Sequence, residues 1–165
     1  MRDLALYWSP SCGSVQKERV ARLFGHPVHA VLTDFPLALL VVATVADLYS
    51  AVSGDAALAT VGYYCVLLGL LSAGLAAVFG FWDLLRIEPS GHVLHSALRH
   101  AAFALGAVSL YVLAFALRSG SEPERVSTPV LALELAGAAL LGAAGWFGGH
   151  LVFGHGVGVH STGDD

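Results

Sequence analysis

Charged residues are scarce in this 165-residue sequence, at 12% of the total, whereas hydrophobic residues make up 56%. An ordinary soluble domain carries about 25% charged residues. The scarcity excludes that class and indicates an integral membrane protein of one domain. Lys and Arg number only eight and are spread thinly, so no basic patch is present and no nucleic-acid partner is expected.

Cysteine is also scarce, since the chain has only Cys12 and Cys65. Two cysteines are too few for a disulfide scaffold, and the absence of a Cys-x-x-Cys-His motif excludes covalent c-type haem attachment. The N-terminus lacks the order of a signal peptide, so we expect the first membrane segment to be retained. The sequence contains no nucleophile paired with a base and no phosphate-binding loop. We therefore expect that the protein is not an enzyme on its own.

Four apolar runs are long enough to cross a bilayer, which takes about 20 residues. They cover about residues 28–51, 58–85, 93–117 and 129–152. Short joins rich in turn residues predict an all-α, integral membrane four-helix up-down bundle spanning residues 26–159, with no convincing internal repeat. Residues 1–25 form a separate surface segment, in which 15–24 predict a basic amphipathic helix, and 160–165 are a polar tail.

The two membrane sides differ in basic residues. We call the side with both termini and the 86–92 join side A, and the opposite side B. Side A has the larger share of Lys and Arg, and side B has only Arg118 and Arg125. By the positive-inside rule, side A and both termini are cytoplasmic in a cell (inner) membrane.

Histidines are confined to one half of the membrane domain. All eight belong to the side A half, together with Asp34 and Asp83. Ionisable groups inside a span are costly and normally face protein or a water-filled cavity. Asp47 and Glu134 lie toward side B, where we expect structural hydrogen bonds.

Small residues form a stripe on each of two spans. Gly69, Ala73, Ala76 and Gly80 recur at helical spacing and lead to Asp83, so this face of the second span should pack against another helix. The fourth span has a similar predicted stripe of Glu134, Ala138, Gly142, Gly145 and Gly149.

The side A cluster predicts a shared polar site. Imidazole suits zinc, copper, iron and nickel, and two histidines on facing helices can ligate haem b. The candidate axial pairs are His29 with His100, or His100 with His150, and Asp34 or Asp83 could orient an imidazole. A structural hydrogen-bond network is the alternative. The candidate metal ligands are His26, His29, Asp34, Asp83, His100 and His150.

The almost purely apolar middle of every span argues against a channel or pump, since a relay needs polar groups through the whole depth. A small metal transporter is a weaker option for the same reason.

Three blocks of sequence resemble a known family. They are Gly25-His26-Pro27-Val28-His29 through Asp34-Phe35-Pro36, then Gly80-Phe81-Trp82-Asp83 with His100, and Gly148-Gly149-His150 through Gly158. Together they resemble the four-helix membrane proteins of domain-of-unknown-function family 2231. The chain departs from the family at Ala30, where proline is common, and at Ala104, where asparagine is common.

The resemblance implies a redox setting, because members are often encoded beside, or fused to, Rieske iron–sulfur domains. The leading hypothesis is therefore a redox-associated membrane subunit that binds haem b or a transition metal, with a redox complex or Rieske-type protein as partner. The alternative is a non-catalytic scaffold or accessory subunit. Homo-oligomerisation stays open.

Overall fold

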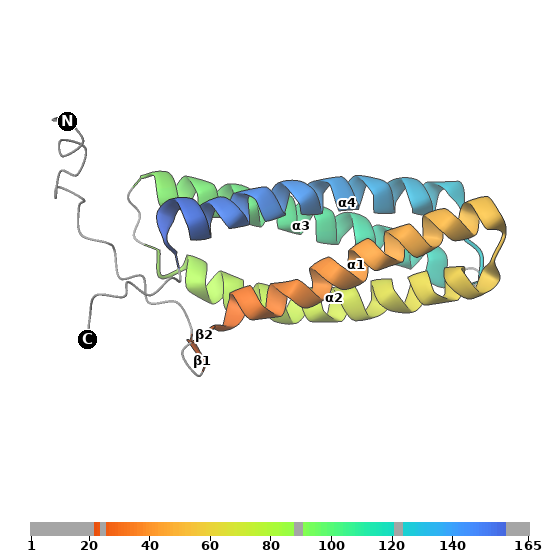
Figure 1. The fold of residues 1–165 in the computed structure, drawn as a ribbon, viewed down its shortest axis with the longest axis horizontal. Helices are drawn as coiled ribbons and strands as arrows, with labels where there is room; N and C mark the ends of the chain where they lie inside the picture. The colour runs from red at the N-terminus through yellow and green to blue at the C-terminus, as the bar shows by residue number, and fades with distance from the viewer. Residues whose placement is uncertain (1–21, 24–25, 88–90, 121–123, 158–165) are drawn as a thin grey trace, which may run out of the picture.

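The fold is a bundle of four long helices that run alternately up and down (Figure 1). The computed structural model describes residues 22–23, 26–87, 91–120 and 124–157. The helices are α1 (Val28–Ser53), α2 (Ala56–Leu84), α3 (His92–Ser119) and α4 (Thr128–Gly149), and a π-helical turn, η1 (His150–Gly154), continues α4. The predicted all-α architecture with four spans is confirmed.

Local sequence explains where the helices begin and end. Gly54 has a positive φ of 76° and donates its N–H to the carbonyl of Ser50, which ends α1. Asp55 then caps α2, because its carboxylate accepts the N–H of Ala57. Gly91, with a φ of 85°, precedes α3, and Pro129 lies in the first turn of α4, where a missing N–H costs nothing.

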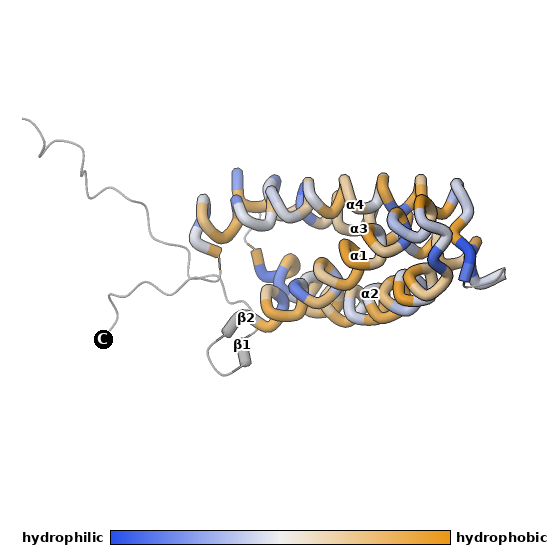
Figure 2. The backbone as a smooth tube through the Cα atoms, turned by 45° about the vertical axis from the view of Figure 1, so that its right-hand side comes forward, coloured by the Kyte–Doolittle hydropathy of each residue, from blue (hydrophilic) through white to orange (hydrophobic). Residues whose placement is uncertain are grey.

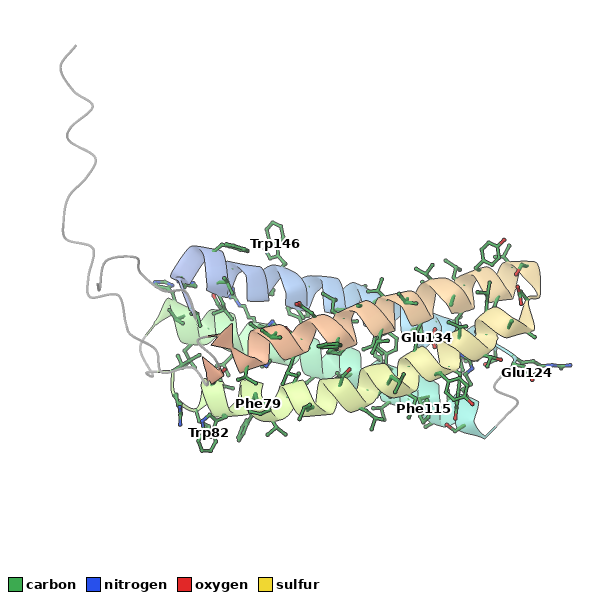
Figure 3. All side chains as sticks on the ribbon, turned by 60° about the horizontal axis from the view of Figure 1, so that its bottom comes forward. Phe79, Trp82, Phe115, Glu124, Glu134 and Trp146 are labelled. Atoms are coloured by element: carbon green, nitrogen blue, oxygen red, sulfur yellow. The ribbon has the colours of Figure 1, made fainter. Side chains whose placement is uncertain are left out.

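Large hydrophobic side chains are exposed on all four helices. Hydrophobic residues predominate along the helices (Figure 2), and all four helices are long and apolar enough to cross a membrane. Trp82 and Trp146 point outward from the bundle, whereas Glu134 lies within it (Figure 3). Both tryptophans lie near the side A ends of their helices, where indole rings favour the membrane–water interface.

The helices are packed as two close hairpins, α1 with α2 and α3 with α4 (Figure 1). Glycines allow the close approach: Gly69 of α2 faces Leu40 of α1, and Gly137 of α4 faces Tyr111 of α3. A Cβ at either glycine would lie 2.7 Å from the facing side chain, so a larger residue would force the helices apart.

The predicted stripe is confirmed on α2 but wrong on α4. Gly69, Ala73 and Ala76 are buried on α2 as expected. On α4 the buried residues beside Glu134 are Val130, Gly137 and Ala144, and the space beside Gly142, Gly145 and Gly149 is open. Small residues cover several faces of α4, so small size alone could not identify the packed face.

The two hairpins repeat the same packing positions, which the sequence did not reveal. Four of the seven buried residues of α1 have a buried counterpart 71 positions later in α3, and four of the six in α2 have one 68 positions later in α4. Several of the counterparts differ in residue type, so the repeat is clearest in the packing. The counterparts are Pro36 and Ala107, Leu40 and Tyr111, Ala43 and Ala114, Asp47 and Arg118, Gly62 and Val130, Val66 and Glu134, Gly69 and Gly137, and Ala76 and Ala144.

The segment before α1 differs from the prediction where the structure describes it. Strand β1 (Arg22–Leu23) pairs antiparallel with β2 (His26–Pro27). We expected Arg22–Leu23 in the amphipathic helix 15–24, whose other residues lie outside the described ones. Pro27 cannot donate a backbone hydrogen bond, which favours a strand or turn immediately before the helix.

Candidate functional site

His29 and His100 come together between the two hairpins. Their rings meet edge to face, with centroids 6.3 Å apart and an interplanar angle of 81°. His29 is the second residue of α1, and His100 lies two turns inside α3. Both side chains are half-buried. The structure thus brings together the first of the two candidate pairs.

Each of these histidines is fixed by a carbonyl of its own hairpin. Nδ1 of His29 lies 2.9 Å from the carbonyl oxygen of Ala76, and Nδ1 of His100 lies 2.8 Å from that of Ala144. A carbonyl only accepts, so each Nδ1 donates its proton and Nε2 carries the lone pair. This is the arrangement by which proteins orient metal-binding imidazoles.

Two glycines make room for the rings. A Cβ at Gly80 would lie 2.5 Å from Cε1 of His29, and one at Gly148 would lie 3.1 Å from Nδ1 of His100. Each glycine lies one turn beyond the carbonyl that binds its histidine. The two imidazole sites are therefore counterparts in the packing repeat described above.

The predicted acidic groups lie differently. Asp34 is exposed on α1. Asp83 is half-buried near the end of α2, close enough for its charge to act on His29. His26 lies in β2, and its side chain is outside the described residues.

His150 belongs to a separate polar group at the side A end. It is the first residue of η1, and its ring packs edge to face against His155 with centroids 4.9 Å apart. An open pocket of about 540 Å³ lies beside these two rings, between η1 and the start of α3. Its lining is Gly91, His92, His95, Ser96, Arg99, His150 and His155.

In residues 22–23, 26–87, 91–120 and 124–157, no three His, Cys, Asp or Glu side chains lie close enough to hold a metal ion. The site formed by the described residues is therefore a two-histidine site. The six-residue metal set stays a prediction.

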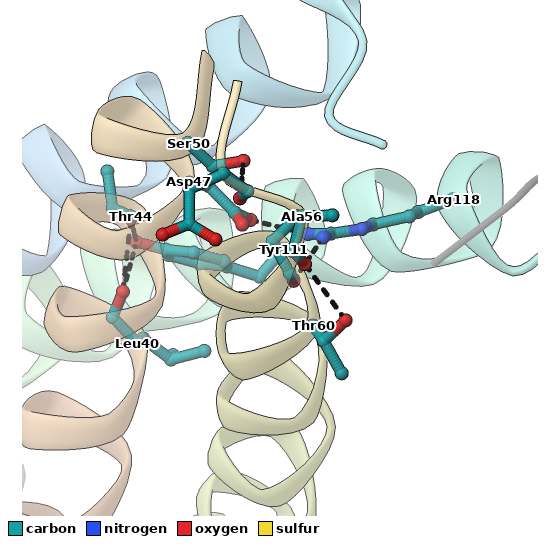
Figure 4. Close-up of polar contacts among 10 residues, drawn as sticks. Leu40, Thr44, Asp47, Ser50, Ala56, Thr60, Tyr111 and Arg118 are labelled. Carbon is teal, nitrogen blue, oxygen red and sulfur yellow. Dashed lines mark hydrogen bonds and ion pairs between the residues drawn. The ribbon is translucent and has the colours of Figure 1, made fainter. Parts of the chain in front are cut away.

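The most deeply buried polar residues lie toward side B. Arg118 of α3 donates to the carboxylate of Asp47 on α1, with Nη1 2.5 Å from Oδ2, and to the carbonyl of Ala59 on α2 (Figure 4). Glu134 of α4 lies within hydrogen-bonding reach of Asp47. All three charged side chains are at most 2% exposed. We call Asp47, Arg118 and Glu134 the side B cluster.

The predicted third span ends at about residue 117, which places Arg118 in the join after it, and the structure corrects this. Arg118 is the penultimate residue of α3 and points into the bundle. The available signal was helical spacing, because Arg118 lies four residues after Ala114 and seven after Tyr111, on the buried face.

A second buried polar group lies nearer the middle of the bundle. The hydroxyls of Thr44 and Tyr111 lie 2.6 Å apart, and Tyr111 also donates to the carbonyl of Leu40 at 3.2 Å (Figure 4). The expectation of an almost purely apolar middle is therefore wrong on this side, since all these groups are buried.

A family model described as "Predicted membrane protein (DUF2231)" matches residues 25–161. No curated protein and no solved structure matches the chain.

Proposed function

Because the chain belongs to the DUF2231 family of membrane proteins, we propose its function from the site: it binds haem b in the membrane as a redox-associated subunit. His29 and His100 are the residues that would hold the haem iron. The observation that carries the proposal is the meeting of two half-buried imidazoles whose Nδ1 atoms are both bound to backbone carbonyls.

The spacing of the rings fits two ligands on opposite sides of one metal ion. Imidazole nitrogen binds a metal at about 2 Å, which places two opposed ring centres about 6 Å apart. The observed separation is 6.3 Å. Both rings use Nδ1 for the bond to a carbonyl, which leaves the lone pair of Nε2 for a ligand.

The number of ligands favours haem over a bare ion. Protein zinc sites take three or four side-chain ligands, whereas haem needs only axial ones from the protein. In the part of the chain that the structure describes, two histidines meet and no third ligand lies beside them. Haem b, when bound, would supply one-electron chemistry at this position.

The surroundings support a bound group between the hairpins at this end. On α1, all the fully buried residues lie between Pro36 and the side B end of the helix, whereas His29, near the side A end, is only half-buried. The hairpins diverge toward the ends that carry His29 and His100 and converge toward the side B cluster (Figure 1). A planar ligand inserted there would cover the exposed parts of both imidazoles.

The proposal includes location and partner. Side A faces the cytoplasm of a cell membrane, and the haem lies toward that side. A Rieske-type protein is the electron partner to be tested, as the family resemblance suggests. Gel filtration of the two purified proteins together, followed by stopped-flow reduction, would test this pairing.

The decisive experiment is the absorption spectrum of the purified protein, with elemental analysis for iron. We expect a Soret band and about one iron per chain or per assembled site. His29→Ala and His100→Ala should each lose the band. His92→Ala changes an exposed histidine of the same helix as His100 and should keep it.

Two outcomes would contradict the proposal. Wild-type protein with neither a Soret band nor stoichiometric metal would favour the scaffold alternative, in which His29 and His100 only hold the hairpins together. A band that survives both alanine substitutions would place any haem elsewhere.

A further inference from the structure

The side B cluster places two carboxyl groups and one guanidinium in the apolar core of the bundle. Asp47 is 0% exposed, Glu134 is 1% exposed and Arg118 is 2% exposed. They come from α1, α4 and α3, so water cannot reach them without separation of helices. We propose that Asp47 and Glu134 bind one proton between them, which makes this cluster a proton-binding site within the membrane.

The first support is the balance of charge. Arg is always protonated in proteins, so Arg118 contributes one positive charge. Two ionised carboxylates beside it would leave one uncompensated negative charge in a region without water, which is strongly unfavourable. One proton on the carboxyl pair makes the cluster neutral.

The second support is a shortage of hydrogen-bond donors. Oδ1 of Asp47 and Oε2 of Glu134 are both buried and have no partner. Two ionised carboxylates can only accept hydrogen bonds, whereas a protonated carboxyl also donates one. The two carboxyl groups are within hydrogen-bonding reach, so a shared proton supplies the donor that the pair lacks.

Nearby hydroxyls do not supply this donor. Thr44 donates to the carbonyl of Leu40 or to Tyr111, and Tyr111 donates to the same carbonyl or to Thr44. Ser50 donates to the carbonyl of Asp55. These hydroxyl protons are directed to other acceptors.

Other titratable groups face the pair from two helices. Cys65 on α2 interacts electrostatically with Asp47, and Tyr111 on α3 with Glu134. Both are neutral when protonated, so neither compensates a second carboxylate. Arg118 is the cation that faces the pair among the described residues.

The proton is held mainly on Glu134. Arg118 binds Asp47 directly at 2.5 Å, which stabilises the ionised form of Asp47. The site does not depend on haem binding at His29 and His100.

Infrared spectroscopy of the reconstituted full-length protein tests this proposal. At neutral pH, exposed carboxyl groups are ionised because their pKa values lie near 4. The carbonyl stretch of a protonated carboxyl group should therefore come from the buried pair. This band should shift in frequency after prolonged exchange into D2O. Glu134→Gln should remove this band, because it replaces the protonated group with a neutral amide of similar shape.

Glu124→Gln is the matched control, since Glu124 is exposed in the join before α4 and its loss should leave the band unchanged. Asp47→Asn provides a second variant: it should also remove the band, because Glu134 is then the one carboxyl group beside Arg118 and ionises to balance its charge. Thermal unfolding of Glu134→Gln should resemble that of the wild type.

The proposal is overturned if the wild-type protein lacks the band, or if the band is the same in Glu134→Gln. A loss of thermal stability in Glu134→Gln as large as that in Arg118→Gln would also overturn it, since an ionised Glu134 would then be required.

Discussion

His29 and His100 show how one residue type is used twice with the same local support. Each donates from Nδ1 to a carbonyl of the neighbouring helix and lies beside a glycine one turn further on. The glycine is needed because the ring occupies the space of a Cβ. Both rings are thereby oriented before any ligand binds, which lowers the cost of binding.

A substitution at Gly80 tests this support. The added Cβ of Gly80→Ala would lie 2.5 Å from the His29 ring, so the ring or the helix must move. Overpacking of this kind costs about 1–3 kcal/mol, against an ordinary gain of about 0.5–1 kcal/mol for Gly→Ala in a helix. We expect lower thermal stability in detergent and weaker haem retention.

Gly74→Ala is the control on the same helix, because nothing lies within 4 Å of its Cβ position. It should keep or slightly raise the melting temperature. Equal stability of the two variants would show that His29 does not occupy the position described.

At the scale of elements, the molecule consists of two hairpins joined by a few specific contacts. His29 meets His100, Leu40 and Thr44 meet Tyr111, and Asp47 meets Arg118. These contacts join α1 to α3, and Arg118 of α3 also donates to the carbonyl of Ala59 on α2. The Asp47–Arg118 contact is the one with opposite full charges, and it lies at the end where the hairpins converge.

Substitutions in this ion pair should be strongly non-additive. Arg118→Gln alone leaves Asp47 as a buried charge without its partner, which costs about 3–5 kcal/mol, and Asp47→Asn alone removes the direct partner of Arg118. The double variant removes both charges, so its loss should be much smaller than the sum. Thermal or denaturant unfolding of the four proteins in detergent measures the coupling.

Arg125→Gln removes an exposed positive charge on the same membrane side and should change stability by less than about 0.5 kcal/mol. Additive effects of Asp47→Asn and Arg118→Gln would contradict the contact that joins α1 to α3.

For the whole molecule, the buried Arg118 strengthens the asymmetry between the membrane sides. The sequence contains Arg118 and Arg125 on side B, but Arg118 is bound to Asp47 inside the bundle. Arg125 is then the only side B Lys or Arg in the printed sequence outside that ion pair. The positive-inside rule therefore favours a cytoplasmic side A more strongly than the sequence count did.

Cysteine labelling in intact cells tests this orientation. In a background of Cys12→Ser and Cys65→Ala, Ser53→Cys lies at the exposed side B end of α1 and should react with a membrane-impermeant maleimide. His92→Cys, at the exposed side A start of α3, should react only after lysis. The reverse pattern would contradict the assigned orientation.

The sequence by itself determined the four spans, their alternation and the concentration of histidine in one half. These follow from local properties: apolar length sets a membrane helix, and turn residues set its ends. It also placed His29 and His100 among a small number of candidates, because histidine inside a span is rarely without a role.

Only the tertiary structure decided which of those residues meet. It paired His29 with His100, placed His150 beside His155, and buried Arg118 with Asp47 and Glu134. It also revealed the packing repeat, in which several counterparts differ in residue type. These contacts depend on the rotation of each helix about its axis, and apolar side chains on nearly all faces leave that rotation undefined until neighbouring helices pack.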